Sequence, residues 1–196
     1  MKKKVAAGAV LAICLSVLIY TTIAYFNTAD TARNVITSGN IKIELQETAL
    51  VNDTEIPFKE SQDVYNVMPG QEVSKIVRVE NTGSNPAYIR ISVDKAIQLA
   101  ESVQGNPDTD LISIDYDSSW TLKDGYYYYN KPLAAGNTTE PLFRNVTFDP
   151  DMGNMYQNSQ AVIKVSAQAT QVKNNGTDVF SAAGWPDTDP AGTDGE

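Results

Sequence analysis

The sequence predicts an all-β protein, a jelly-roll-type β-sandwich that follows an N-terminal signal peptide. Three observations predict this class. Apolar and polar residues alternate in several short runs, Pro-Gly and Asp-Gly turns separate the runs, and no pattern of similar strength repeats at helical spacing. Alternation is typical of a strand with one face in a core and one in water. Many short strands of this spacing indicate a sandwich or jelly roll rather than a βαβ fold.

The N-terminal segment has the parts of a secretory signal. Three lysines (residues 2–4) precede an apolar run over residues 5–23, and Thr22 and Ala24 offer the small side chains that a signal peptidase prefers. We therefore expect cleavage between Ala24 and Tyr25, with the chain secreted and attached to the membrane only before cleavage. An uncleaved anchor is the alternative, because about 20 apolar residues can span a bilayer.

The composition indicates which partners and which covalent cross-links are not expected. Removing residues 1–24 changes the formal net charge from −9 to −12, because the segment holds three lysines and no acid. An acidic chain repels phosphate backbones, so nucleic acid is not an expected partner. The single cysteine, Cys14, lies within the apolar run, so we expect no disulfide in the secreted domain.

Histidine is absent from the chain. The common zinc and copper ligand sets therefore cannot be assembled, and neither can a Ser-His-Asp or Cys-His nucleophile. We expect no catalytic residue, no metal site and no required cofactor. Calcium stays open in principle, because it needs only oxygen ligands.

The alternating runs give the expected strands in chain order. They lie at residues 41–45, 73–79, 87–94, 142–148 and 161–170. Lys75 is the one polar residue on the apolar parity of its run. Residues 95–103 are expected to form one short helix.

Turn residues fit between these runs. Residues 68–71 (Met-Pro-Gly-Gln) form an expected Pro-Gly turn before the strand at Val73, and residues 81–86 form a loop of hairpin type. Asp124-Gly125 is the signature of a type I′ hairpin, here between a strand that begins at Trp120 and the four tyrosines 126–129.

These patterns divide the chain into four parts. Residues 1–24 are the signal peptide, 25–36 an N-terminal strand segment, 37–186 the sandwich domain and 187–196 an acidic flexible tail. Apolar residues near the end of the domain are expected to pack back onto it, namely Val179, Phe180 and Trp185.

Three polar or aromatic groups are candidate sites. Tyr126–Tyr129 would form either a sticky surface or, in a strand, two core-facing and two outward tyrosines, and the structural interpretation is favoured. Asp149, Asp151 and Asn154 could offer calcium ligands, but they fit an ordinary turn better. The aspartates within residues 108–117 could supply paired carboxylates for glycoside hydrolysis, although a solvated face is favoured.

Several short segments resemble TasA and camelysin-like proteins. The resemblance is carried by residues 22–27 and 35–43, with further matches at 68–71, 77–83 and 88–91. Members of that family are exported through a signal peptidase of the SipW type. The resemblance implies a jelly roll that is secreted to the bacterial surface and assembled into biofilm matrix fibres.

In such fibres the N-terminal segment of one subunit completes a sheet of the next. The resemblance therefore implies a donor strand with anchors at Tyr25, Phe26, Val35 and Ile36, a second copy of the chain as partner and an accessory matrix protein as a further one. Pairing of this segment within its own sheet is the alternative. A monomeric surface-displayed adhesion module is the second functional hypothesis, and a camelysin-like peptidase is the third.

Overall fold

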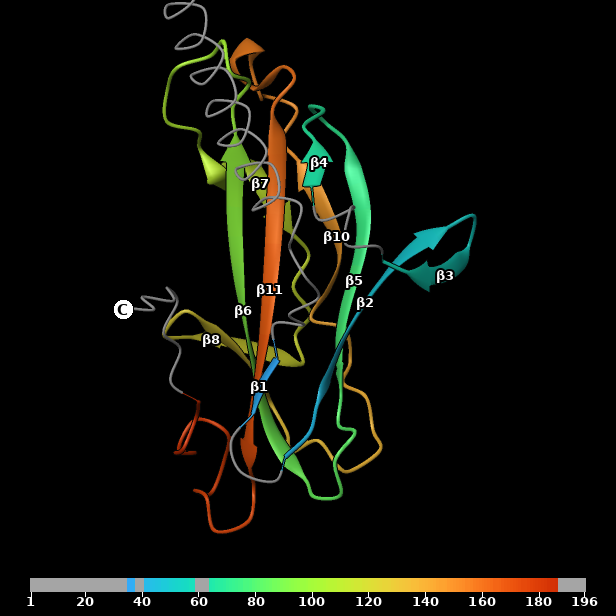
Figure 1. Ribbon diagram of the computed structural model, residues 1–196, viewed down its shortest axis with the longest axis vertical. Coiled ribbons are helices and arrows are strands. Elements are labelled where there is room, and N and C mark those ends of the chain that lie inside the picture. Colours follow the sequence, from blue (N-terminus) through green and yellow to red (C-terminus); the bar gives the residue numbers. More distant parts are fainter. Residues whose placement is uncertain (1–34, 38–40, 59–63, 187–196) are drawn as a thin grey trace, which may run out of the picture. The chain divides into compact units, whose positions relative to one another are not determined.

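The computed structural model describes residues 35–37, 41–58 and 64–186, which form two facing β-sheets (Figure 1). The first, called the β6–β11 sheet, has the order β1 (Val35–Thr37), β11 (Gln160–Gln171), β6 (Ala87–Gln98), β9 (Tyr126–Tyr129) and β8 (Trp120–Lys123), and β4 (Val64–Asn66) also pairs with β11. The second, called the β5–β10 sheet, has the order β3 (Thr54–Pro57), β2 (Glu44–Val51), β5 (Glu72–Glu80), β10 (Phe143–Phe148) and β7 (Ile112–Ile114). The predicted all-β sandwich is confirmed.

Strands β6 and β11 form the longest pairing of the domain. They run side by side in Figure 1 and pair antiparallel from Gln160 opposite Gln98 to Gln171 opposite Ala87. Their inward side chains join those of the other sheet in one core cluster, which includes Ile89, Ile91, Ile163, Val77, Val79, Phe143 and Phe148. Burial of each such side chain contributes about 1.5–3 kcal/mol. The alternation in the sequence therefore identified the core-facing parity correctly.

Strand β10 changes face at a bulge. Its register to β5 shifts between Phe143 and Asn145, so that Phe143, Val146 and Phe148 all reach the core although their numbers differ in parity. A bulge leaves backbone N–H groups outside the ladder. Here Asp115 accepts from the backbone N–H groups of Arg144 and Asn145 at 2.8 and 2.7 Å.

Two predicted turns are confirmed, whereas the predicted hairpin at residues 81–86 is wrong, because β5 and β6 lie in different sheets. Asp124 and Gly125 both have positive φ, 50° and 80°, as a type I′ turn between β8 and β9 requires. Gly70 has φ +74°, and the Gln71 N–H donates to the carbonyl of Met68 at 3.0 Å.

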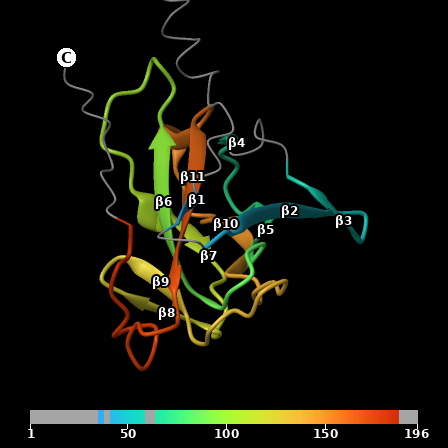
Figure 2. The same ribbon diagram turned by 60° about the horizontal axis from the view of Figure 1, so that its bottom comes forward.

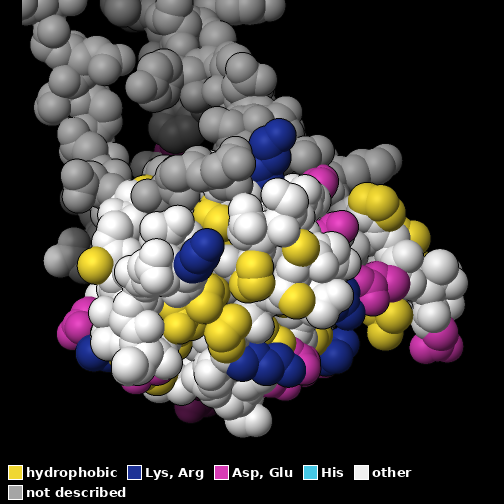
Figure 3. Space-filling view, turned by 90° about the horizontal axis from the view of Figure 1, so that it is seen from below, with side chains coloured by type: hydrophobic (Ala, Val, Ile, Leu, Met, Phe, Trp, Pro, Cys, Tyr) yellow, Lys and Arg dark blue, Asp and Glu magenta, His cyan; other side chains and the backbone are white. Residues whose placement is uncertain are grey.

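The β2–β3 hairpin was not predicted from the sequence. Its turn residues Asn52 and Asp53 have φ of 48° and 59°, without a glycine to announce them. The hairpin projects from the end of the β5–β10 sheet (Figure 1) and carries exposed apolar side chains at Leu50, Val51 and Ile56. Figure 3 shows apolar and acidic side chains gathered on this part of the surface, at the right.

The segment after β11, residues 172–186, folds back as a strap over the outward face of the β6–β11 sheet. Val179 is buried there in a second cluster with Tyr88 and Tyr128, and Trp185 packs against it. Figure 2 shows this red segment beside the β8–β9 hairpin. The prediction that these apolar residues pack back on the domain is confirmed.

The expected helix at residues 95–103 is wrong. Strand β6 continues to Gln98, because its pairing with β11 extends that far. Within this strand, the Lys95 ammonium donates to the carbonyls of Thr109 and Ile112, both at 2.9 Å. Ile41 and Ile43 are buried as expected, but β2 begins only at Glu44. In the described part of the chain, no helix is long and apolar enough to cross a membrane.

Candidate functional site

Among the described residues, strands cover the outer edge of β11 only in part. Strand β6 pairs with β11 along its whole length on one side. On the other side β4 pairs antiparallel with residues 160–162, and β1 pairs parallel with residues 167–169. Among the described residues, no strand lies beside residues 163–166 on that side. We call residues 163–166 the open stretch.

The open stretch has the side-chain pattern of a strand inside a sheet. Ile163 and Val165 face the core and are 0% and 3% exposed, whereas Lys164 is exposed and Ser166 is half-buried on the outward face. A strand added at this edge would therefore place every second side chain beside the core cluster. This is the physical requirement for recognition by strand addition.

Of the predicted donor residues, only Val35 and Ile36 belong to the described part of the chain. Val35 lies in β1, opposite Ala167 of the same chain, and its half-buried side chain packs against the core. Ile36 pairs through its backbone with Gln168. Ala24, Tyr25 and Phe26 lie outside the described residues. The described part of the predicted donor segment thus pairs within its own sheet in the single chain.

The tyrosine strand β9 has the predicted alternation. Tyr127 and Tyr129 pack on the main core, whereas Tyr126 and Tyr128 face outward, where the strap covers them. The structural interpretation of this run therefore holds, and the outward pair is not a bare surface.

An arginine lies among these outward aromatic rings. The guanidinium of Arg90 lies 3.9 Å from the ring centroid of Tyr126 and 4.5 Å from that of Trp185. It also donates to Gln168 Oε1 at 2.7 Å and to the Tyr128 hydroxyl at 3.2 Å. Cation–π contacts that are partly shielded from water contribute about 1–2 kcal/mol. Arg90 therefore fastens the strap to the sheet.

The aspartates of residues 108–117 serve the backbone instead of forming a catalytic pair. Asp108 accepts from the Asp110 N–H at the start of the 3-10 helix Thr109–Leu111. Asp115 holds the β10 bulge, as described above. Asp117 accepts from the N–H and hydroxyl of Ser119, and these bonds hold the pKa of the Asp117 carboxyl below its ordinary value. The solvated-face interpretation therefore fits them better than glycoside hydrolysis.

The candidate calcium ligands also form a turn. Asp149 Oδ1 accepts from the Asp151 N–H at 2.7 Å, so one carboxylate oxygen is engaged with its own backbone. Within the described residues, no group of three or more His, Cys, Asp or Glu side chains could hold a metal ion.

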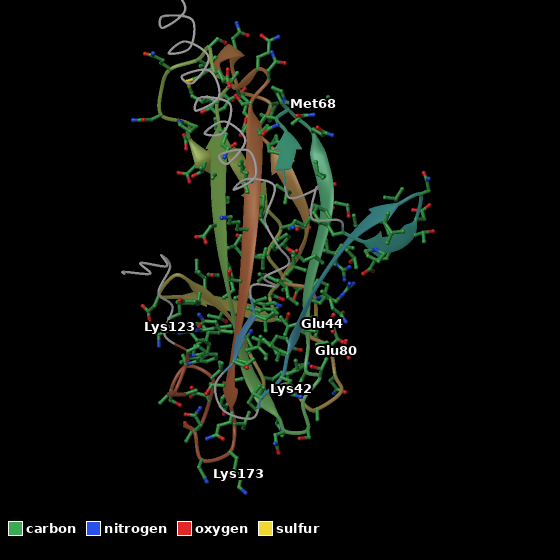
Figure 4. The ribbon with its side chains drawn as sticks, viewed as in Figure 1. Lys42, Glu44, Met68, Glu80, Lys123 and Lys173 are labelled. Carbon is green, nitrogen blue, oxygen red and sulfur yellow. The ribbon has the colours of Figure 1, made fainter. Side chains whose placement is uncertain are left out.

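Two carboxylates that were not predicted as a pair lie opposite one another on the neighbouring strands β2 and β5. Glu44 and Glu80 are cross-strand partners, side by side in Figure 4. The Gln46 amide donates to Glu80 at 2.6 Å, and the neighbouring Arg78 holds both oxygens of Glu55. The hydrogen bond from Arg78 keeps the pKa of Glu55 below its ordinary value. These groups form a polar row on the outward face of the β5–β10 sheet.

A model of the camelysin metallo-endopeptidase family matches residues 1–120, which is more than half of the chain. The chain belongs to the camelysin family. TasA is a member of the same family, so the resemblance found in the sequence is confirmed. No curated protein and no solved structure matches the chain.

The family's name implies a metal-dependent peptidase, and the donor set of this camelysin family member does not fit one. Catalytic zinc sites use histidine with carboxylate or cysteine, and this chain has no histidine and a single cysteine, Cys14. Of the carboxylates described above, Asp108, Asp115 and Asp149 accept from backbone N–H groups and Glu55 from Arg78. These residues therefore do not form the ligand set of a catalytic zinc ion.

Proposed function

We propose that this camelysin family member is a secreted structural subunit of a bacterial extracellular fibre, which polymerises by donating its N-terminal segment to the next copy. The observation that carries the proposal is the open stretch of β11, between β4 and β1. Membership of the family that includes TasA supports the same class of function. An absence of catalytic residues and cofactors is part of the proposal.

Strand addition explains why this edge would bind. An exposed edge offers unpaired N–H and C=O groups to an extended segment, and alternate side chains of that segment reach the core. Residues 25–34 extended at about 3.3 Å per residue reach about 33 Å, whereas the open stretch needs only about 13 Å. The segment is therefore long enough to bridge from one copy to the next and pair there.

Register indicates where the incoming segment would lie. In the single chain Val35 is opposite Ala167 in the parallel pairing of β1 and β11. Because the acceptor's own Val35 occupies this place, a neighbour's segment would pair no further than Ser166, with its Asn27 opposite Ser166 and its anchor Phe26 beside Val165. Each copy gives one segment and receives another at a different surface, and such a head-to-tail contact forms an open filament.

Cleavage after Ala24 would start assembly. While the signal holds Tyr25 at the membrane, the donor segment cannot enter a neighbour. The partners of the proposal are therefore a signal peptidase of the SipW type, a second copy of the chain and an accessory matrix protein, outside a bacterial cell.

Electron microscopy of the chain that begins at Tyr25 tests the proposal. We expect filaments from this chain and monomers from a variant that lacks residues 25–34, which keeps β1 and its pairing with β11. Circular dichroism and urea unfolding check that the variant is folded. Normal polymerisation of this folded variant would contradict strand donation by the segment and favour another assembly contact.

Cysteine trapping locates the acceptor edge, because the chain that begins at Tyr25 has no cysteine. We expect a disulfide between copies when an Asn27→Cys chain is mixed with a Ser166→Cys chain and oxidised. Ser113→Cys is the matched control, because Ser113 is exposed and lies in β7, the edge strand of the other sheet. This variant should remain unlinked. Equal linkage at Ser113 would contradict the β11 edge as acceptor. A chain that stays monomeric throughout would favour the adhesion module, and chelator-sensitive proteolysis would favour the peptidase.

A further inference from the structure

Two tyrosine rings stack between the two sheets of the sandwich. Tyr116 follows β7 of the β5–β10 sheet, and Tyr127 lies in β9 of the β6–β11 sheet. Their ring centroids are 4.1 Å apart with an interplanar angle of 21°. The edge of Phe143 packs against Tyr116, with centroids at 5.9 Å and an angle of 86°. The pair is therefore held in one arrangement by its surroundings.

The Tyr127 hydroxyl lies close enough to Tyr116 to affect its pKa. Burial raises the pKa of the Tyr116 phenol above its ordinary value, and a hydrogen bond to Tyr127 raises it further. In a near-parallel stack with centroids 4.1 Å apart, the ring carbons of the two phenols face one another at close range, and these include carbons ortho to the oxygens. Tyr116 is still 36% exposed, so a diffusing oxidant can reach one member of the pair.

We propose that Tyr116 and Tyr127 form a site of oxidative cross-linking, which joins the two sheets through a dityrosine bond. The oxidant is a peroxide used by a haem peroxidase. Each phenol loses one electron and one proton, and the two phenoxyl radicals form one carbon–carbon bond between ortho carbons. Two ortho C–H bonds break, their protons return to the phenol oxygens, and the peroxide takes up two electrons and two protons to give two waters.

Geometry distinguishes this pair from its neighbours on β9. Tyr126 and Tyr128 have ring centroids 6.4 Å apart at an angle of 65°, an edge arrangement that does not oppose their ortho carbons. Both also belong to strand β9, so a bond between them would not connect two separate parts of the fold. Only the Tyr116–Tyr127 stack, among the tyrosine pairs of the described chain that are in ring contact, connects the two sheets.

Such a bond would stabilise the domain in the way that a disulfide does, and the sandwich domain has no cysteine from which to form a disulfide. The only cysteine, Cys14, lies in the N-terminal apolar segment. A cross-link between residues 116 and 127 restricts the unfolded chain, and this restriction stabilises the folded state. An extracellular domain that meets peroxide would thus gain stability where its sheets meet.

The test treats the dilute full-length chain, kept in mild detergent, with hydrogen peroxide and a haem peroxidase. We expect dityrosine fluorescence in the monomer band, a peptide pair joining residues 116 and 127 that lacks two hydrogen atoms, and a higher thermal midpoint after oxidation. Tyr116→Phe keeps the ring and should lose all three signals. The matched control Tyr126→Phe should retain them.

Two results would overturn the proposal. One is dityrosine formed only between chains, seen as covalent dimers without the internal peptide pair. The other is an unchanged yield in Tyr116→Phe. Urea unfolding of each variant before oxidation shows that it is folded, so that a lost signal reports the chemistry. Filament formation by the same chains is scored separately, because the cross-link lies within one copy.

Discussion

The ammonium of Lys75 lies 3.0 Å from the carboxylate of Glu47 on the core side of the β5–β10 sheet. The Lys75 side chain is fully buried, whereas Glu47 is 25% exposed. The ring of Phe58 lies under the same ammonium, with its centroid at 4.1 Å. The one polar exception in an apolar run is therefore a buried cation supported by a carboxylate and an aromatic face.

Removing the carboxylate should cost more than removing the cation. Glu47→Gln removes the negative charge that lies 3.0 Å from a buried ammonium, so we expect the free energy of unfolding to fall by about 1–3 kcal/mol. Lys75→Met keeps the volume and removes the buried charge, and it should cost less. Urea unfolding of both single variants and the double variant measures the coupling. A greater loss in Lys75→Met would show that its other contacts dominate.

Two glycines with positive φ should respond differently to substitution. A Cβ on Gly125 would meet no atom within 4 Å, so Gly125→Ala should cost only the backbone strain of φ +80°, about 1 kcal/mol. A Cβ on Gly176 would lie 2.7 Å from Ser181 Oγ and 2.9 Å from its backbone carbonyl carbon. Gly176→Ala should therefore also loosen the strap. Limited proteolysis within residues 172–186, faster in the second variant alone, is the check.

The strap should depend on Trp185 more than on Phe180. Trp185 covers the Arg90 guanidinium and meets Tyr128 edge-on at 5.7 Å, whereas Phe180 is 40% exposed. We expect Trp185→Ala to lower the free energy of unfolding by about 1–3 kcal/mol and Phe180→Ala to lower it by less. Chemical unfolding gives both values. Equal losses would show that Arg90 does not anchor the strap through Trp185.

The fold class could be predicted because its determinants are local. Alternation places Ile89, Ile91 and Ile163 on one face without knowledge of their partners, and Asp124-Gly125 specifies its turn from two residues. The strap was predicted from apolar residues in a polar segment. These features depend on residue type and spacing alone.

The remaining features depend on contacts between distant segments. The extension of β6 over Lys95 follows from its pairing with β11, which overrides local helical preference. The turn at Asn52 lacks a glycine, and the stacking of Tyr116 on Tyr127 joins two sheets. The open stretch of β11 becomes visible only when the lengths of β1 and β4 are known. No pattern in one strand could indicate an edge left free by two others.

The β10 bulge should depend on one carboxylate. Asp115→Ala removes the acceptor of the Arg144 and Asn145 N–H groups, so we expect a loss of about 1–2 kcal/mol. Asp115→Asn keeps an acceptor oxygen and should lose less. Hydrogen exchange at these two amides should accelerate in the alanine variant before the rest of β10 does. Unchanged exchange there would mean that water replaces the carboxylate without cost.

Acid should weaken the fold partly through Glu140. The Tyr129 hydroxyl and the Lys131 ammonium both donate to its carboxylate, with Lys131 at 3.1 Å, and these bonds hold the pKa of Glu140 below its ordinary value. A carboxyl with a lowered pKa in the folded state binds protons more readily when unfolded. The contribution of Glu140 to the free energy of unfolding is therefore present above the pKa that its carboxyl has in the unfolded chain, near 4.5. This contribution is lost as the pH falls through the lower pKa of the folded state. Glu140→Gln should flatten the fall of stability below about pH 5, whereas Glu101→Gln, an exposed control, should not. Urea midpoints measured from neutral pH into this acidic range decide between them, and equal slopes in wild type and Glu140→Gln would contradict the linkage.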